Sequence, residues 1–261
     1  GTEAISMEYD IPQEEVEVLL PSLIVLNRLL KYTVNDSILL SNVLLSDAVI
    51  FEMLFPKEAS FVVKDYEEFT LQSATSIAER FGRDLNHISR VSSVALEIYD
   101  KMKKLHGYKL RERTLLQVSA ILQDIGKYVN VKNHALLSYN TITNLDIVGI
   151  NDHERLIIAT VCYYHNGNIP SMDSPIYNQL SQEDRVMVSK LAAILQISNA
   201  INTSHSPKFE QVNVNMKNGK LNIYLTTLKN INLEKWAFIA KSKLFREVYG
   251  LNATIIKRGV L

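Results

Sequence analysis

The feature that most constrains the fold is the helical spacing of apolar side chains between Tyr66 and His205. Apolar stripes follow a period of 3.6 residues, and capping residues or glycines mark the ends of each stretch. The stripes are Ile88, Val91, Val94, Ala95, Ile98 and Tyr99; Leu115, Leu116, Ser119, Ala120 and Leu122; and Leu191, Ala192, Ile194, Leu195 and Ile197. The expected helix starts are Asp84, Asn151 or Asp152, and Ser181, and the joints are Gly107, Gly126, Gly149 and Gly167. This part of the chain is predicted to be all-helical.

The segment before this region has a different pattern. Asp10 is expected to cap a helix with Pro12 in its first turn. Pro21 is expected to kink this helix or to begin a second one, because proline removes a backbone donor. Residues 41–45 are typical of a short strand, which cannot satisfy its backbone groups alone. This strand, and Gly1 in place of Met, lead us to expect a chain cut from a longer protein.

After residue 207 the hydrophobic period changes to two on both sides of Asn218-Gly219, which predicts a hairpin. Asn232 is expected to cap a last helix that Gly250 ends, and residues 253–256 are expected to add a third strand. We predict a mainly α protein in three parts: residues 1–56, then a helical domain at 57–206, then a small α+β domain at 207–261.

Composition limits the possible partners. Lys plus Arg and Asp plus Glu number 28 each, so there is no global field to attract nucleic acid or an anionic membrane. The basic residues at 101–104 are explained by a helix end. No apolar stretch reaches the ~18 residues that a membrane span needs. The single Cys162 lies in an apolar run, where a buried thiol is expected. We expect a cytoplasmic protein that binds neither membrane nor nucleic acid.

Polar residues interrupt the apolar helices at a few positions. They are His87, Gln123, Asp124, His134, His165, Asn199 and Asn202. Imidazoles and carboxylates that converge from several helices are what a hydrolytic metal centre needs, so these residues form the candidate pocket.

The pattern resembles the HD phosphohydrolase superfamily, which uses a His, a His-Asp pair and a distant Asp as ligands. His87 and Asp124 match two of these, but Gln123 stands where the second His is expected and Asn199 where the last Asp is expected. An amide is a weak neutral ligand. The resemblance therefore implies an HD-like helical domain with a degenerate site, and we expect no metal in this chain.

A closer resemblance rests on the order of several segments: residues 122–126 (LQDIG), 133–139 (NHALLSY), 163–165 (YYH) and 191–202 (LAAILQISNAIN). Together they are similar to the Ppx/GppA family of exopolyphosphatases and guanosine pentaphosphate phosphohydrolases. The likeness extends to 11–21, similar to the end of the family's actin-like phosphatase region, and to 244–250, similar to its terminal α+β domain. It covers essentially the whole chain.

This resemblance places the family's phosphoric anhydride hydrolysis, with Mg or Mn, in N-terminal domains that this sequence does not show. The chain has no Gly-rich phosphate loop, so it is expected to be non-catalytic. The resemblance implies a homodimer and a groove for polyphosphate or a phosphorylated nucleotide. Lys127, Lys132, His134, His165 and His205 resemble groove residues, whereas Asn166, Gln196 and Thr203 stand where the family has basic residues.

Two alternatives remain open from the sequence. One is a self-sufficient HD-type metal-dependent phosphohydrolase that uses His87, Asp124, His134 and His165 in a rearranged site. The other is a purely structural interaction module that buries the apolar surface of residues 11–54 against a partner or a second copy.

Overall fold

The structure is a computed structural model that describes residues 2–9, 11–33, 49–50, 53, 60–204, 208–217 and 219–259. The chain divides into two compact units, residues 1–59 and 60–261. The predicted strand at 41–45 and the predicted boundary at 56–57 lie outside the described residues. The boundary near 207, and the origin of the first segment in an actin-like domain, stay predictions.

The first unit contains α1 (Thr2–Tyr9) and α2 (Gln13–Leu30). The helix begins later than predicted, because Pro12 is the N-cap of α2 and lies before its first turn, and the predicted cap Asp10 lies outside the described residues. The alternative of a second helix at Pro21 is wrong, because α2 runs through this residue. A proline removes only one amide donor, and the turn beside it stays bonded, with the Ser22 hydroxyl donating to the Val18 carbonyl at 2.8 Å.

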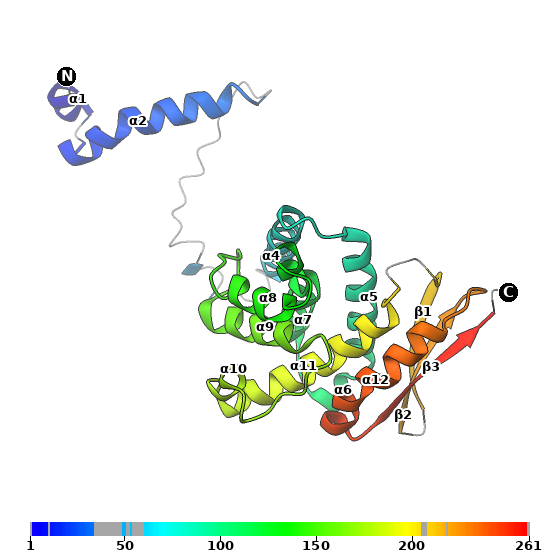
Figure 1. Ribbon diagram of the computed structural model, residues 1–261. Coiled ribbons are helices and arrows are strands. Elements are labelled where there is room, and N and C mark those ends of the chain that lie inside the picture. The colour runs from blue at the N-terminus through cyan, green and yellow to red at the C-terminus, as the bar shows by residue number, and fades with distance from the viewer. Residues whose placement is uncertain are drawn as a thin grey trace. The chain divides into compact units, whose positions relative to one another are not determined.

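The second unit begins with the helices predicted for 66–205 (Figure 1). They are α4 (Ser60–Arg80), α5 (Leu85–Lys101), α6 (Lys103–His106), α7 (Leu110–Leu122), the 3-10 turn η1 (Ile125–Tyr128), α8 (His134–Ile142), α9 (Asp152–Tyr164), α10 (Pro175–Asn178) and α11 (Gln182–Ile201). The three predicted apolar stripes are buried throughout. No helix of the described residues is both long and apolar enough to cross a membrane.

The predicted capping residues are confirmed at the starts of three helices, α5, α9 and α11. The Asp84 side chain accepts from the Asn86 amide at 2.9 Å, and Ser181 accepts from the Asp184 amide at 3.1 Å. Asn151 and Glu154 cap each other's backbone at the start of α9. These local bonds set the helix ends. The packing of α7 against α4, α5 and α9 then brings the end of α7 next to α8 and the end of α9.

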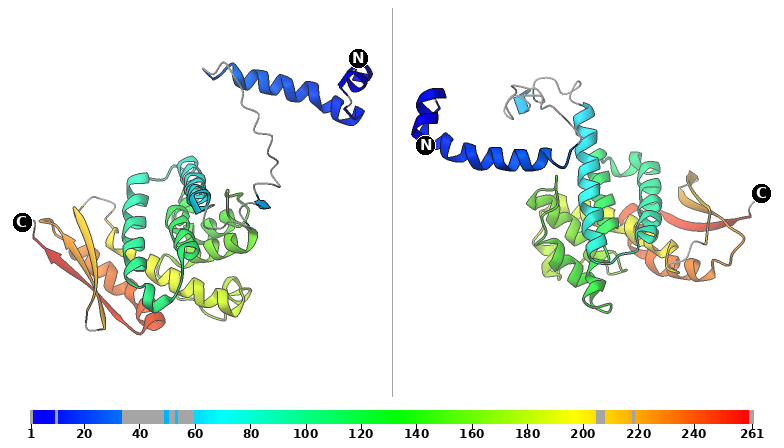
Figure 2. Two further views of the ribbon diagram at one scale, coloured as in Figure 1. Left: turned by 180° about the vertical axis from the view of Figure 1, so that it is seen from behind. Right: turned by 90° about the horizontal axis from the view of Figure 1, so that it is seen from above.

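The α+β region packs on the helices through α12 (Asn232–Tyr249), which lies against α11. Strands β1 (Gln211–Lys217) and β2 (Lys220–Thr226) form the predicted hairpin, and β3 (Asn252–Arg258) pairs parallel to β2. Figure 2 shows this sheet at one side of the helical bundle. The predicted cap at Asn232 is one residue late, because Ile231 is the N-cap and Asn232 is already helical. Gly250 ends α12 in the left-handed conformation, as expected.

Candidate functional site

The candidate site is built on the tight turn between α7 and η1. The Ser138 hydroxyl of α8 donates to the Gln123 carbonyl at 2.8 Å and accepts from the Gly126 amide at 2.9 Å. A Cβ at Gly126 would overlap the backbone of His134 and Ser138, so only glycine lets α8 approach this turn. The turn therefore fixes the position of His134 relative to the end of α7.

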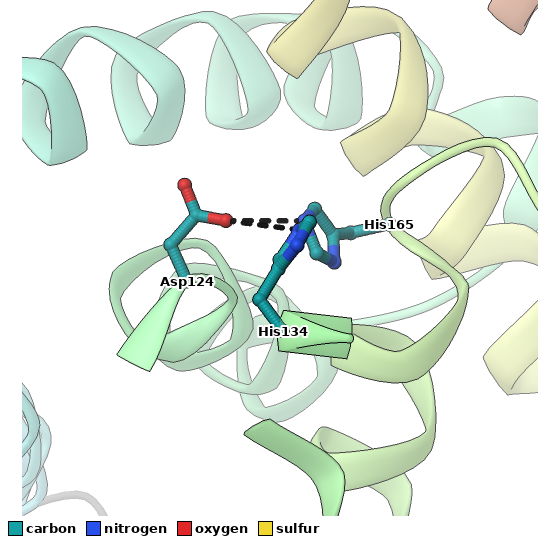
Figure 3. A group of neighbouring side chains, drawn as sticks. All are labelled: Asp124, His134 and His165. Atoms are coloured by element: carbon teal, nitrogen blue, oxygen red, sulfur yellow. Dashed lines mark hydrogen bonds and ion pairs between the residues drawn. The ribbon is translucent and has the colours of Figure 1, made fainter. Parts of the chain in front are cut away.

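Two imidazoles face one carboxylate oxygen at this turn (Figure 3). His134 Nε2 lies 3.6 Å and His165 Nε2 lies 3.3 Å from Asp124 Oδ1, and the two Nε2 atoms are 3.3 Å apart. The other ring nitrogens face backbone carbonyls: Nδ1 of His134 is 2.7 Å from the Val131 oxygen, and Nδ1 of His165 is 2.5 Å from the Cys162 oxygen. All three side chains are buried, so the two rings are held with Nε2 toward Asp124.

The charges around Asp124 favour its carboxylate. Burial by itself would raise the pKa of Asp124, but His165 and Lys127 lower this pKa well below its usual range. Lys127 Nζ lies 2.7 Å from Asp124 Oδ2, which leaves Oδ1 to the imidazoles. Burial lowers the pKa of His134, an effect that the Val131 carbonyl and Asp124 partly oppose. The carboxylate and a neutral His134 are therefore the favoured forms.

Lys241 is a further cation near this cluster that the sequence analysis did not identify. It lies on α12, and its pKa is lowered by burial, while the Asp124 charge raises this pKa and Lys127 lowers it. No pattern in the sequence pointed to it, because α12 belongs to the segment assigned to a separate small domain. The packing of α12 on α11 brings this lysine within electrostatic range of Asp124.

A cavity of about 180 Å³ adjoins Asp124. Its lining residues are Gly82, Arg83, Asp84, His87, Ile88, Gln123, Asp124 and Lys127. His87 and Gln123 are both buried, and no donor among the residues that the structure describes reaches Gln123 Oε1. The cavity thus unites three of the predicted pocket residues, His87, Gln123 and Asp124.

The remaining predicted residues are not among those that line this cavity. Asn199 is half-buried on α11 and does not line the cavity. Asn202 is buried and donates to the Ser198 carbonyl at 3.1 Å. Lys132 is exposed in the segment before α8, and His205 lies outside the described residues.

Two further residues named in the sequence analysis, Gln196 and Cys162, are buried. Gln196 donates to the backbone carbonyls of Tyr164 and Asn168 at 2.7 and 2.8 Å, so this amide links α11 to the end of α9. Cys162 is fully buried as predicted, and burial raises the pKa of its thiol.

A wider hollow of about 810 Å³, near the start of α11, contains none of the predicted site residues. It is lined by Tyr108, Ser181, Gln182, Glu183, Val186 and Met187.

Comparison with known proteins shows which family this region matches. The model of the family described as Ppx/GppA phosphatase, domain III, matches residues 71–244, which include every member of the Asp124 arrangement. A guanosine-5'-triphosphate,3'-diphosphate pyrophosphatase of Photobacterium profundum is 23% identical over 162 residues. The match covers 62% of this chain and 31% of the relative, so the chain spans less than a third of that protein's length.

Proposed function

Because the chain belongs to the Ppx/GppA phosphatase family through its domain III, we propose that it is the C-terminal region of a phosphohydrolase acting on polyphosphate or guanosine pentaphosphate. In this proposal the chain is accessory to the reaction. It holds a phosphate-bearing ligand or organises a homodimer, and phosphate cleavage takes place in domains outside it. The name of the Photobacterium relative, a pyrophosphatase of a guanosine nucleotide, supports the substrate class.

The observation that carries the accessory role is the side chain of Gln123. It lines the cavity beside Asp124, where an HD-type hydrolase needs an imidazole ligand. An amide has no anionic form and is a weak metal ligand, so the four-ligand hydrolytic set is incomplete. Two cationic side chains, Arg83 and Lys127, and two anionic ones, Asp84 and Asp124, line the cavity, so it has no excess of either charge.

A phosphate ligand has cationic donors available at the rim of this site. Lys132 is exposed and free to orient toward a phosphate, and the Lys127 side chain is 23% exposed while it pairs with Asp124. Lysine ammonium groups hold phosphate oxygens by charge-assisted hydrogen bonds. Lys132 and Lys127 are therefore the proposed contacts, whereas His134 donates its Nδ1 hydrogen to the Val131 carbonyl and has no donor left for a phosphate.

The test is phosphate release by the purified chain from polyphosphate, guanosine pentaphosphate and a generic phosphoester, with His87→Ala as the control. The accessory role predicts no release above background for either protein, together with binding of tripolyphosphate that weakens with salt. Turnover that disappears in His87→Ala would overturn this role and support a self-sufficient HD-type hydrolase, the alternative that the convergence of Asp124, His134 and His165 favours.

A structural interaction module is the second alternative, and it is favoured by exposed apolar side chains on α2. Leu23, Ile24 and Val25 have exposed fractions of 51%, 61% and 59%. Sedimentation at low and high salt distinguishes the interaction module from the phosphate-binding role. A dimer that persists in high salt, formed by a chain without affinity for tripolyphosphate, supports the module and contradicts the phosphate-binding role.

A further inference from the structure

The geometry around Asp124 points to a site for one divalent transition-metal ion of the zinc class. We propose that Asp124 Oδ1, His134 Nε2 and His165 Nε2 bind this ion, with a solvent molecule as the fourth donor. This ligand set shares only Asp124 with the set expected from the HD resemblance. The inference does not depend on the proposed accessory role, because a chain can bind an ion without hydrolysing phosphate.

The first argument is the position of protons on the two rings. A backbone carbonyl is only an acceptor, so Nδ1 of His134 facing Val131 and Nδ1 of His165 facing Cys162 must carry their hydrogens. In the neutral rings both Nε2 atoms are then lone pairs. These lone pairs and the anionic Asp124 Oδ1 face one another in a buried site, which needs a cation or an added proton between them.

The second argument is distance. In a tetrahedral zinc site with bonds of about 2.0–2.2 Å, neighbouring donor atoms lie roughly 3.3–3.6 Å apart. The three separations here are 3.3, 3.3 and 3.6 Å between the same three atoms. An ion slightly outside the plane of the three atoms, as tetrahedral coordination requires, would lie about 2.1 Å from each, which is within the range of zinc–ligand bonds. The ligands therefore need almost no movement to bind an ion.

The third argument is the support behind the ligands. Metal-bound histidines donate their second ring N–H to a carbonyl or carboxylate, which fixes the ring and raises its basicity. Here the backbone carbonyls of Val131 and Cys162 supply this support. Two imidazoles and one carboxylate favour zinc or ferrous iron over magnesium or calcium, which prefer oxygen ligands.

The same chain provides a matched control. His153 Nε2 lies 3.0 Å from both carboxylate oxygens of Asp184, so it forms an imidazole–carboxylate pair without a second ring. Its side chain is 64% exposed, in contrast to 1% for His165. This pair has two donors where the proposed site has three, and it is not expected to retain an ion against a chelator.

The experiment is calorimetric titration of the untagged, chelator-treated full chain with Zn²⁺ and with Co²⁺, together with X-ray absorption of the zinc-loaded protein. We expect one ion per chain, two imidazoles in its coordination shell, and a higher melting temperature with zinc. His134→Gln and His165→Gln, where circular dichroism shows them folded, should bind zinc at least tenfold more weakly. His153→Gln should bind it as the wild type does.

A second variant keeps the test decisive if the histidine variants do not fold. Lys127→Met removes a positive charge next to Asp124 and should bind Zn²⁺ roughly tenfold more tightly, since like charges repel at this range. Four outcomes would each overturn the inference: no stoichiometric zinc or cobalt on the wild type, zinc held with fewer than two imidazoles, unchanged affinity in folded His165→Gln, or zinc bound no more tightly by Lys127→Met than by the wild type. Zinc binding without phosphate release leaves the accessory role intact, and phosphate release would overturn only that role.

Discussion

Two polar clusters lie at opposite ends of α7, and they differ in how completely their groups are paired. The Glu154 cluster, at the start of α7, joins Arg111 to Glu154 at 2.6 and 2.5 Å, and Arg111 also donates to the Gly149 carbonyl at 2.6 Å. The Asp124 cluster, at the other end, consists of Asp124, Lys127, His134 and His165.

In the Glu154 cluster each acceptor meets a donor, because Glu154 also caps the Asn151 amide at 3.2 Å. In the Asp124 cluster two ring nitrogens and a carboxylate oxygen face one another with their hydrogens placed elsewhere. A fully paired cluster stabilises the fold, whereas converging acceptors form a site for a cation. Substitutions in each cluster test this division between a structural cluster and a binding cluster.

The largest expected effect is at Gly126, which links the Asp124 cluster to the backbone. Gly126→Ala should lower the free energy of unfolding by about 3 kcal/mol, at the upper end for overpacking, because the new Cβ meets backbone atoms that cannot rotate away. Urea denaturation measures the change. Gly259→Ala is the control, since a Cβ there meets nothing and should change stability by less than about 0.5 kcal/mol. Equal effects of the two substitutions would contradict the role of this close approach.

The next effect concerns the Glu154 cluster. Glu154→Ala should lower the free energy of unfolding by about 1–2 kcal/mol, because it removes charge-assisted hydrogen bonds to Arg111 and the cap on Asn151. The value is reduced for solvent screening, since Arg111 is 41% exposed. Asp152→Ala is the control. Its ion pair with Arg155 is similarly short at 2.8 Å, but the Asp152 side chain is 91% exposed, so less than about 0.5 kcal/mol is expected.

The sequence predicted the parts of this comparison that depend on neighbouring residues. Helix starts at Asp84, Asn151 and Ser181, and the hairpin at Gly219, follow from caps and turns that act within a few residues. The exception was the alternative of a second helix at Pro21, because one lost donor does not end a long helix.

The site was predicted as a set of residues but not as a geometry. His134 and His165 were identified from the sequence, yet nothing in it shows that both rings turn Nε2 toward Asp124. That orientation depends on the backbone carbonyls of Val131 and Cys162. Every residue has a backbone carbonyl, so residue types alone do not indicate which carbonyl a ring will face. Lys241 was missed for another reason, since only the packing of distant helices brings it near Asp124.

A smaller effect is the pH dependence of the Glu154 cluster. Burial by itself would raise the pKa of Glu154, but Arg111 lowers it below its usual value, so the carboxylate stabilises the folded state above the unfolded pKa of about 4.3. This stabilisation is lost as the pH falls through the lowered folded pKa. Glu154→Gln should therefore be about 1 kcal/mol less stable than wild type at pH 7.

Denaturation series of the two proteins between pH 7 and pH 3 measure this difference. It should shrink below about pH 4.3 and approach zero when Glu154 is protonated in the folded wild type. A difference that stays constant over this range would show that the Arg111–Glu154 charge pair contributes no stability and that only the amide's shape differs. The Glu154 cluster would then differ from the Asp124 cluster only in its hydrogen bonds and not in a stabilising charge pair.

The smallest expected effect on stability is at Lys132. This residue tests whether the Asp124 cluster serves ligand binding while the Glu154 cluster serves stability. Lys132 is exposed, so Lys132→Ala should change the free energy of unfolding by less than about 0.5 kcal/mol, while weakening tripolyphosphate binding by about threefold. Glu154→Ala should do the reverse, with lower stability and unchanged tripolyphosphate affinity. Titration calorimetry and urea denaturation of both variants give the four values. Loss of phosphate affinity in Glu154→Ala, or none in Lys132→Ala, would place the phosphate contacts away from the Asp124 cluster and break the division of roles between the two ends of α7.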